Sequence, residues 1–360
     1  VICHRHDSIL LLFGFSQCGN ISNDSSMRDS DGDKGKGKAR QAEQNPTEPM
    51  DAPHRRLAVE ALAGLSAGFG TTLITHPLDF LKLRLQLDTT ATSQTAAIRN
   101  VWRNLVQTAT TANGQFSSFT FLTSMYRGIG PNLIGSTSAW ALYFYLYRQF
   151  KNVHLYAFHT ESEWNDRNLK SWHYLSSAFL AGWSTSILTN PIWVIKTRMI
   201  ATNRTTSGAY TSILDGIRQI YTHEGVFGFY RGLVPALFSV AQGAVQLSLY
   251  DLLKRHLINS QQHGDHTISE QLTTIQYFYA SSVSKMISTI IFYPLQVLRS
   301  RLQILTNTKS VASATHIATD MLRREGVAGF YKGLPANLCR VVPATCTTFI
   351  IYEKVKQLCG

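Results

Sequence analysis

The residues most able to do chemistry in this chain recur in three segments, at 77–84, 191–198 and 294–301, and each segment begins with proline. The first segment places an acidic residue, Asp79, three positions before a basic one, Lys82. Residues three apart lie on one face of a helix, so both side chains would project in the same direction. If three such helices surrounded one axis, the acid of each helix could pair with the base of the next. The segments therefore predict a gate that is held by breakable ion pairs.

The predicted gate is incomplete, because only the first copy has both charges. The second copy has Trp193 in the acidic position and the third has Gln296 there, so the ring can hold at most one acid–base pair. Gln86 and Gln303 follow the basic positions by four residues and could add hydrogen bonds to the gate. We therefore expect a weakly latched ring, made of Asp79, Lys82, Trp193, Lys196, Gln296 and Arg299 with the two glutamines.

An aromatic-basic-glycine triplet follows each segment, at 126–128, 230–232 and 331–333. One Pro-x-Asp-x-x-Lys segment would be explained by a chance helix kink, but three copies that are each followed by a triplet are not. The chain is therefore one unit repeated three times, with about 100 residues per copy. Solenoid repeats have periods of roughly 20–50 residues, so this period instead fits two long helices and a connection.

The helices that must position these residues are predicted by weak one-sided apolarity. Six segments show it, at about 57–86, 129–150, 171–200, 231–256, 273–303 and 333–357. Proline inside a helix removes one hydrogen bond and kinks the helix. We therefore expect Pro77, Pro191 and Pro294 to bend the odd-numbered helices at the same depth, so that the three converge and close a cavity.

Composition limits the possible functions. The 360 residues carry a net charge of +12, so anionic partners are expected. The basic residues recur at the repeat motifs and form no run or stripe, which argues against nucleic acid. A basic soluble helical protein that binds nucleic acid remains an alternative, but it leaves the three prolines unexplained. The five cysteines form no CxxC pair and have no histidines at metal spacing, and HExxH and Walker motifs are absent. No metal site and no enzyme activity are therefore predicted.

Hydropathy alone would classify the chain as soluble. Its mean hydropathy is −0.06, and no segment has 18 uninterrupted apolar residues. A membrane helix that lines a water-filled cavity, however, needs apolar residues only on its outer face. A soluble bundle and a membrane bundle therefore both remain open on composition.

The ends and linkers differ from the repeats. We expect a disordered N-terminal extension at 1–53, because residues 20–53 are polar and contain almost no large apolar side chains. Met50 lies just before the first repeat, so residues 1–49 are interpreted as a gene-model extension or a dispensable tail. The expected organisation is repeats at 54–150, 171–257 and 272–358, with polar linkers at 151–170 and 258–271.

These motifs resemble the signature of the mitochondrial carrier family over about residues 57–358. The acidic-Gly pair that this family has before the triplet is present at 224–225 and 325–326, while a longer loop at 112–124 replaces it in the first repeat. The resemblance implies an all-α protein of the mitochondrial inner membrane. It implies six transmembrane helices in three pseudo-symmetric two-helix repeats with short matrix helices, and a transporter with no cofactor. The gate described above would be the matrix gate.

The resemblance also implies a second gate on the cytoplasmic side. The family ends its even-numbered helices with an aromatic-acidic-x-x-basic pattern, which matches at 250–254 and 352–356. The first repeat has Arg148 in the acidic position. The implied cytoplasmic gate is therefore also incomplete, and its members are Lys151, Asp251, Lys254, Glu353 and Lys356.

The implied substrate contacts lie seven residues after each triplet glycine, at Gly135, at Ser239 with Val240, and at Arg340. Arg340 would supply a fixed cation, and Gly135 would leave room for a bulky group. Two further candidates come from the residues themselves. Lys285 lies in the middle of the fifth helix, where an ionisable side chain is costly, and its spacing from Gln296 puts both on one face. Structural pairing or snorkelling of Lys285, and a lipid-facing Trp140, are the plainer interpretations.

The substrate class predicted from these residues is large, planar and anionic, because Trp140 and Trp193 could stack on rings while Arg340 and Lys285 bind phosphates. Local strings such as TNPIWVIKTR and YPLQVLRSRLQ resemble the FAD and folate transporter branch of the family. The resemblance implies transport of FAD by alternating access, with FAD as substrate rather than cofactor. Folate, NAD and pyrimidine nucleotides are the alternatives, and a carrier-fold adaptor without transport is another. Inner-membrane lipids, cardiolipin among them, are the other expected partners.

Overall fold

The computed structural model describes residues 52–91, 93–110, 115–158, 171–202, 209–262, 274–305 and 314–359. This part of the chain is built of helices, and an isolated antiparallel bridge joins Thr110 to Phe116. The predicted all-α fold is confirmed. The expected extension at 1–53 lies almost wholly outside the described residues.

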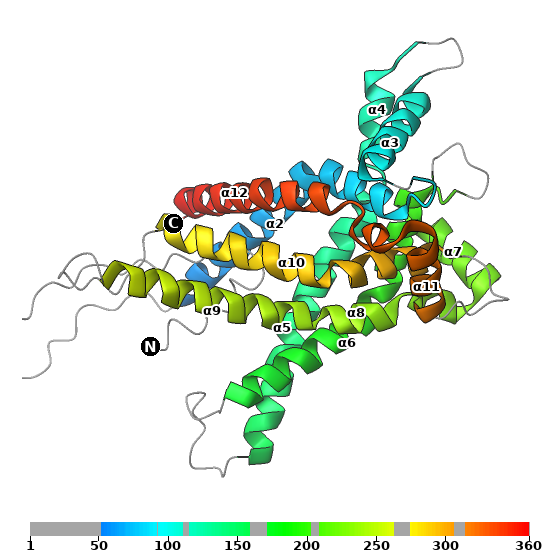
Figure 1. Cartoon of the computed structure of the whole chain (residues 1–360). Helices are drawn as coiled ribbons and strands as arrows, with labels where there is room; N and C mark the ends of the chain where they lie inside the picture. Colours follow the sequence, from blue (N-terminus) through cyan, green and yellow to red (C-terminus); the bar gives the residue numbers. More distant parts are fainter. Residues whose placement is uncertain are drawn as a thin grey trace, which may run out of the picture.

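Six long helical stretches form the body of the molecule (Figure 1). They are α2 (Ala52–Leu87), α5 (Ile129–Phe158), α6 (Ser171–Ala201), α8 (Leu233–Ser239) followed by α9 (Ala241–Gln262), α10 (Thr274–Ile304) and α12 (Leu334–Cys359). Each covers one of the six expected segments. Two helices run further than expected, since α5 continues through the first part of the linker at 151–170 and α9 through the first part of the linker at 258–271.

The six long stretches are counted one to six in chain order, so the odd-numbered long helices are α2, α6 and α10. Short helices follow each of these three. The second repeat has α7 (Ile213–Glu224) and η2 (Val226–Tyr230), and the third has α11 (Ala314–Glu325) and η3 (Val327–Tyr331). The first repeat has two α-helices, α3 (Gln94–Ala109) and α4 (Ser118–Met125). The region expected as a long loop at 112–124 therefore contains most of α4, which begins where the Ser117 hydroxyl accepts a hydrogen bond from the Thr120 amide.

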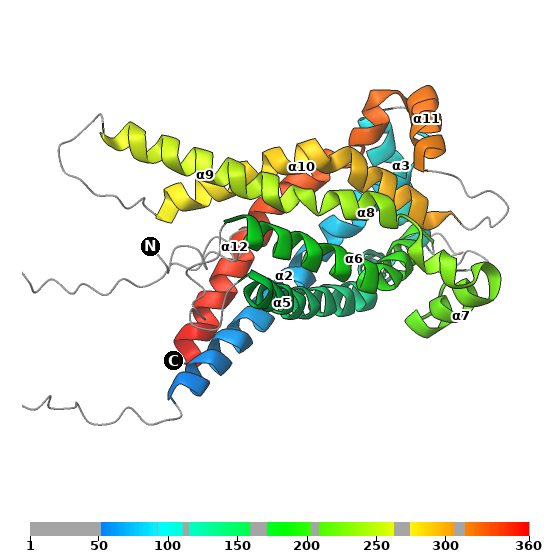
Figure 2. The same cartoon turned by 90° about the horizontal axis from the view of Figure 1, so that it is seen from below.

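The long helices pack in three pairs, α2 with α12, α5 with α6 and α9 with α10. In both views the pairs run together at the end that carries α3, α7 and α11, and diverge toward the opposite end (Figures 1 and 2). The hydrogen bonds between α2, α6 and α10 in the described part of the chain all join their C-terminal halves, as in the bond from Lys82 to Gln296. The structure is therefore closed at the end with the short helices.

The triplet glycines explain part of this closure. Gly128, Gly232 and Gly333 have φ values of 80°, 74° and 80°, a left-handed conformation that favours glycine. A Cβ atom on Gly232 would lie 2.9 Å from the Arg299 carbonyl oxygen, and one on Gly333 would lie 2.9 Å from the Lys82 carbonyl oxygen. Each of these glycines thus lets the chain turn while it touches the odd-numbered helix of the next repeat.

Each repeat has its own apolar cluster at the closed end. One representative contact set joins α6 to α7 through Val194, Ile195 and Ile220, with Tyr210 between them. Equivalent clusters are centred on Phe80 and Leu85 in the first repeat and on Val297 and Leu302 in the third. The short helices therefore hold the C-terminal halves of the odd-numbered helices, where the candidate gate lies.

By length and apolar composition, one described helical stretch qualifies as a membrane span, Val226–Ser260. That test is weak for helices that face a polar cavity, because such helices carry polar residues on their inner face. Long helices of 26 to 36 residues rise about 40–54 Å at 1.5 Å per residue, which exceeds the roughly 30 Å of a hydrocarbon core.

Candidate functional site

The eight residues of the predicted matrix gate all line one cavity of about 270 Å³ between the C-terminal halves of α2, α6 and α10. Four further polar residues of the lining are Thr197, Ser239, Gln242 and Ser300. The sequence repeat thus brings Lys82, Lys196 and Arg299 together from three helices. The cavity combines cations, amides and one tryptophan, a set suited to an anionic ligand with a flat ring.

The only acid in this ring does not pair with a base of the next odd-numbered helix, as the sequence had led us to expect. Asp79 instead accepts from Arg340 of α12, with Oδ1 and Nη1 2.8 Å apart. Arg340 is the cation predicted to contact substrate. The reason is geometric, since α12 packs directly against α2 and brings Arg340 to Asp79. One ion pair therefore joins the predicted substrate site, through Arg340, to the predicted matrix gate, through Asp79.

Lys82 of α2 is linked to α10 by a hydrogen bond to the side-chain amide of Gln296. Its Nζ atom donates to Gln296 Oε1 over 3.1 Å, and Gln296 Nε2 donates to Gln242 Oε1 over 3.1 Å. Gln242 Nε2 in turn donates to the Thr289 hydroxyl over 3.3 Å. An ammonium can only donate, so Lys82 fixes the orientation of both amides. The glutamine in the acidic position thus replaces an ion pair by a directed hydrogen bond.

Lys196 lies against Trp193 and bonds to a residue that sequence analysis missed. Its Nζ atom is 4.9 Å from the Trp193 ring centroid and donates to Asn132 Oδ1 over 2.7 Å. The Trp193 Nε1 atom donates to the Thr189 hydroxyl over 3.2 Å, which orients the ring. Asn132 lies on α5, four residues after a triplet glycine. The sequence could have indicated Asn132 by this spacing, because Asn337 lies at the same distance from the third triplet glycine.

Gln86 and Gln303 brace the helices below the ring. Gln86 Nε2 donates to the Tyr293 hydroxyl over 3.1 Å, and the Thr197 hydroxyl donates to Gln303 Oε1 over 2.7 Å. Neither glutamine bonds to a charged member of the ring among the described contacts. They link α2 and α6 to α10, so they strengthen closure of the same end by a different route from the one expected.

The predicted substrate contacts lie on the even-numbered long helices, which are α5, α8 with α9, and α12. Only some of these contacts line the cavity. Ser239 lines it. Gly135 does not leave an open space, because a Cβ atom there would lie 3.1 Å from Ile192 and 3.7 Å from the Trp193 ring. Val240 packs against α6, where a Cβ atom on Gly182 would lie 2.6 Å from it. Gly135 therefore packs closely against Ile192 of α6, and Val240 also contributes to helix packing.

Lys285 and Trp140 lie outside the lining of this cavity. Lys285 is half-buried, and its ammonium makes no hydrogen bond or ion pair with another described residue, while its carbonyl accepts from the Ser288 hydroxyl. Arg340 is the charged residue whose field acts on the ammonium. Trp140 stacks on Phe144, with ring centroids 5.6 Å apart. From Lys285 to Gln296 the helix α10 rises about 16 Å, so these two residues lie that far apart along its axis.

The predicted cytoplasmic gate is described only in part. Lys254 lies 5.6 Å from the Tyr277 ring centroid, across the α9–α10 pair. Asp251 is exposed and makes no ion pair with another described residue. Lys151 is half-buried near the end of α5. The side chains of Glu353 and Lys356 lie outside the described residues. The acids and bases of this end are thus not assembled into a ring by the described contacts.

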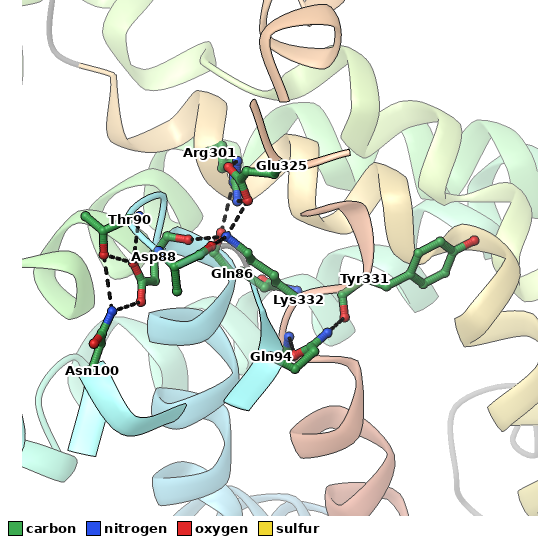
Figure 3. Close-up of polar contacts among 11 residues, drawn as sticks. Gln86, Asp88, Thr90, Gln94, Asn100, Arg301, Glu325, Tyr331 and Lys332 are labelled. Atoms are coloured by element: carbon green, nitrogen blue, oxygen red, sulfur yellow. Dashed lines mark hydrogen bonds and ion pairs between the residues drawn. The ribbon is translucent and has the colours of Figure 1, made fainter. Parts of the chain in front are cut away.

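At the closed end, each repeat has a cluster of polar contacts around the basic residue of its triplet, and we call each cluster a corner. In the third repeat Glu325 accepts from Arg301, with Oε2 and Nη2 2.8 Å apart, and from Lys332 (Figure 3). Lys332 also donates to the Asp88 carbonyl, which ties this corner to the end of α2. Burial by itself would raise the pKa of Glu325, but the hydrogen bonds from Arg301 and Lys332 hold that pKa below its ordinary value.

The chain matches the family model described as mitochondrial carrier protein over residues 53–157, 167–261 and 270–360. It is 36% identical over 312 residues to the mitochondrial FAD carrier protein FLX1 of Saccharomyces cerevisiae, covering 84% of this chain and 97% of that protein. It is 34% identical to the chloroplastic folate transporter 1 of Arabidopsis thaliana, covering 83% and 94%. It is 31% identical to the mitochondrial nicotinamide adenine dinucleotide transporter 2 of Arabidopsis thaliana, covering 83% and 79%.

Proposed function

This chain belongs to the mitochondrial carrier protein family, and we propose that it transports FAD across the mitochondrial inner membrane by alternating access. Members of this family are transporters rather than enzymes, and they carry small molecules as substrates. The observation that carries the FAD proposal is the cavity that Lys82, Lys196, Arg299 and Trp193 line together. The FAD carrier FLX1, which aligns over nearly its whole length, supports the same substrate.

The chemistry of the cavity fits a dinucleotide. FAD has a pyrophosphate, which suits Arg340 and Lys285, and flat rings, which suit Trp193 and Trp140. The cavity holds about 270 Å³, near the lower end of ligand pockets. A dinucleotide would therefore extend from it along α10 toward Lys285, about 16 Å away. This elongated arrangement of cations and rings favours FAD over a small single-ring anion.

The proposed arrangement in the membrane has six spans, made by α2, α5, α6, α8 with α9, α10 and α12. Repeats of two helices point the same way through a bilayer, so their axis would run along the membrane normal. Pro77, Pro191 and Pro294 lie inside α2, α6 and α10 and would bend these spans toward the axis. The outer faces would contact inner-membrane lipids, with cardiolipin among them. Some relatives are chloroplastic, so the compartment is part of this proposal.

The proposed mechanism begins from the closed end. The pyrophosphate competes with Asp79 for Arg340, and the freed carboxylate changes the balance of charge in the ring. Only a ligand with different affinities for the two states can drive the exchange between them. Substrate binding at Arg340 would supply such a difference, because the Asp79–Arg340 pair must break when phosphate takes its place. The cytoplasmic gate of Lys151, Asp251, Lys254, Glu353 and Lys356 would close in the other state.

Folate is the second candidate substrate, because the folate transporter aligns nearly as well. The test is uptake of labelled FAD by liposomes that contain the purified chain, competed by FMN, folate, NAD and pyrimidine nucleotides. Saturable FAD uptake that resists the competitors supports the proposal. Uptake of none of them would support a carrier-fold adaptor or a different substrate.

The same assay tests the site. We expect Arg340→Ala and Lys285→Ala each to reduce uptake at least as much as Asp79→Asn, because the first two remove cations that hold the pyrophosphate. The amount of protein in the membrane is the control. Normal uptake by both alanine variants would contradict the assignment of these residues to the substrate.

A further inference from the structure

A buried chain of hydrogen bonds leads away from the candidate gate through two residues that have no role so far. Lys196 Nζ donates to Asn132 Oδ1 over 2.7 Å. Asn132 Nδ2 lies 3.3 Å from His76 Nδ1, and His76 Nε2 lies 3.2 Å from the Arg127 carbonyl oxygen. His76 is fully buried and Asn132 is 4% exposed. The chain thus joins α6, α5, α2 and the first triplet.

The direction of every bond in this chain is determined by its two ends. The Lys196 ammonium can only donate, so the Asn132 oxygen must face it and the Asn132 amide nitrogen must face His76. That nitrogen donates, so His76 Nδ1 must accept. The Arg127 carbonyl can only accept, so the proton of the imidazole must be on Nε2. One neutral tautomer of His76 therefore satisfies all four groups, and a second ring proton would oppose the Asn132 amide.

The surroundings of His76 hold few other charges. The Tyr126 ring stacks on it, with centroids 5.8 Å apart, and Lys196 and Asp79 are the charged residues whose fields act on it. The Arg127 guanidinium turns away and donates to the Met199 carbonyl over 2.5 Å. Polar contacts to His76 therefore come from its two ring partners, Asn132 and the Arg127 carbonyl.

The other repeats contain the same positions without the same connection. The residues before the motif prolines are Asn190 and Tyr293, and both donate to the carbonyl of their triplet's basic residue, over 3.3 Å and 2.9 Å. The positions equivalent to Asn132 are Ala236 and Asn337. The Asn337 Oδ1 atom is buried and accepts no hydrogen bond within the described part of the chain. A link from this carbonyl to a gate lysine through an asparagine is therefore described in the first repeat only.

We propose that Asn132 and His76 are positioning residues for Lys196, and that they hold this lysine in the closed ring in place of the acid expected to pair with it. That acid is Asp79 of the preceding odd-numbered helix, which pairs with Arg340 instead. The neutral Asn132 oxygen takes that place, and His76 keeps the amide from turning over. This inference rests on the proposed gate function, while the stability test below does not require any particular substrate.

The experiment combines Asn132→Leu and His76→Phe with Lys196→Met in the full chain. Asn337→Leu is the matched control, because it removes a buried asparagine from the same position of another repeat. Melting temperature in detergent and initial FAD uptake by liposomes are both measured. We expect Asn132→Leu to lower the melting temperature by about 2–6 °C and uptake by roughly three- to tenfold when Lys196 is present. In the Lys196→Met background both effects should largely disappear, since no ammonium remains to be held.

Equal losses in both backgrounds would overturn the proposal, because they would mean that Asn132 acts independently of Lys196. The same conclusion follows if Asn337→Leu reduces uptake as much as Asn132→Leu. If no variant and no wild-type protein takes up FAD, the proposed substrate fails, and the coupling in melting temperature between positions 132 and 196 still decides this inference.

A pH profile separates positioning from general packing. Asn132→Asp keeps an oxygen for Lys196 but presents a second acceptor to His76, so both ring nitrogens of His76 must then donate. Uptake by this variant should be highest near pH 5.5 and fall toward pH 8, within the range where histidine titrates. Adding His76→Phe should remove this dependence. An unchanged pH profile in Asn132→Asp would contradict the donor and acceptor roles assigned here.

Discussion

The corner of the first repeat and the corners of the other two repeats occupy equivalent places but are held differently. In the second repeat Glu224 accepts from Arg198 over 2.5 Å and from Arg231 over 2.8 Å. Glu325 has the same role in the third repeat, with Arg301 and Lys332 (Figure 3). In the first repeat Arg127 donates to the Met199 and Tyr210 carbonyls, over 2.5 Å and 3.2 Å. No glutamate precedes that triplet.

The comparison teaches that one corner can be closed by two kinds of chemistry. A buried carboxylate between two cations is costly to break, because removal of one partner leaves uncompensated charge. The described hydrogen bonds of the Arg127 guanidinium go instead to neutral groups, the Met199 and Tyr210 carbonyls and the Thr202 hydroxyl. The first repeat also carries α4 where the others have a short 3₁₀ turn. Its corner therefore tolerates a different connection, while the other two require their acids.

The largest expected effect comes from Glu325→Gln. Lys332 and Arg301 are 1% and 6% exposed at their side chains, so both cations would stay buried without a carboxylate. Loss of one partner from such a group costs about 3–5 kcal/mol. Thermal unfolding of the purified protein in detergent should show a drop well above 5 °C, at roughly 2–4 °C for each kcal/mol.

The control for that change is Asp320→Asn, which removes the exposed Asp320–Arg324 pair on the same short helix. Exposed pairs contribute about 0–1 kcal/mol, so little change is expected. Similar drops for the two variants would mean that the corner is not held by charge pairing.

A smaller effect is expected from Arg127→Met in the first repeat. The change leaves the Met199 and Tyr210 carbonyls without this donor, and hydrogen bonds to charged groups contribute about 1.5–3 kcal/mol. The melting temperature should fall by less than in Glu325→Gln. Arg127→Lys should recover little, because a single ammonium lacks the planar fork of arginine. A larger drop than that of Glu325→Gln would reverse the comparison.

The smallest effect is the acid sensitivity of the third corner. The folded-state pKa of Glu325 is lowered by its hydrogen bonds, although burial opposes this, so the unfolded chain binds a proton more readily. The resulting stability is present above the unfolded pKa of about 4.3 and is lost as pH falls through the folded value. Melting temperatures measured from pH 7 down to pH 3.5 should fall more in the wild type than in Glu325→Gln. Parallel curves would contradict the assignment.

Much of the fold could be predicted from periodic residue types. The three proline segments and their triplets indicated three equivalent helix pairs, and the structure adds that the triplet glycines have a left-handed backbone. Boundaries were less predictable, as the extension of α5 to Phe158 and the helix α4 show. Aromatic and aliphatic residues continue past position 150, and α5 packs against α6.

The candidate site divides in the same way. Spacing predicted that Asp79, Lys82, Trp193, Lys196, Gln296 and Arg299 meet in one ring, since a motif repeated on three helices returns to the same depth. Spacing could not predict that Asp79 pairs with Arg340, or that Asn132 holds Lys196. Both partners come from even-numbered helices, and their reach depends on how those helices pack against α2 and α6.

The sequence by itself determined the three-fold repeat, the helical fold, the absence of acids from two of the three ring positions and the excess of cations that the cavity contains. These follow from residue types and from distances along one helix, which the chain fixes locally. Only the tertiary structure decided which cation meets the single acid, which amide faces which lysine, and whether a glycine leaves a space or packs against a neighbouring helix. Those outcomes depend on contacts between helices far apart in sequence, where differences of a few ångströms select one hydrogen-bond partner over another.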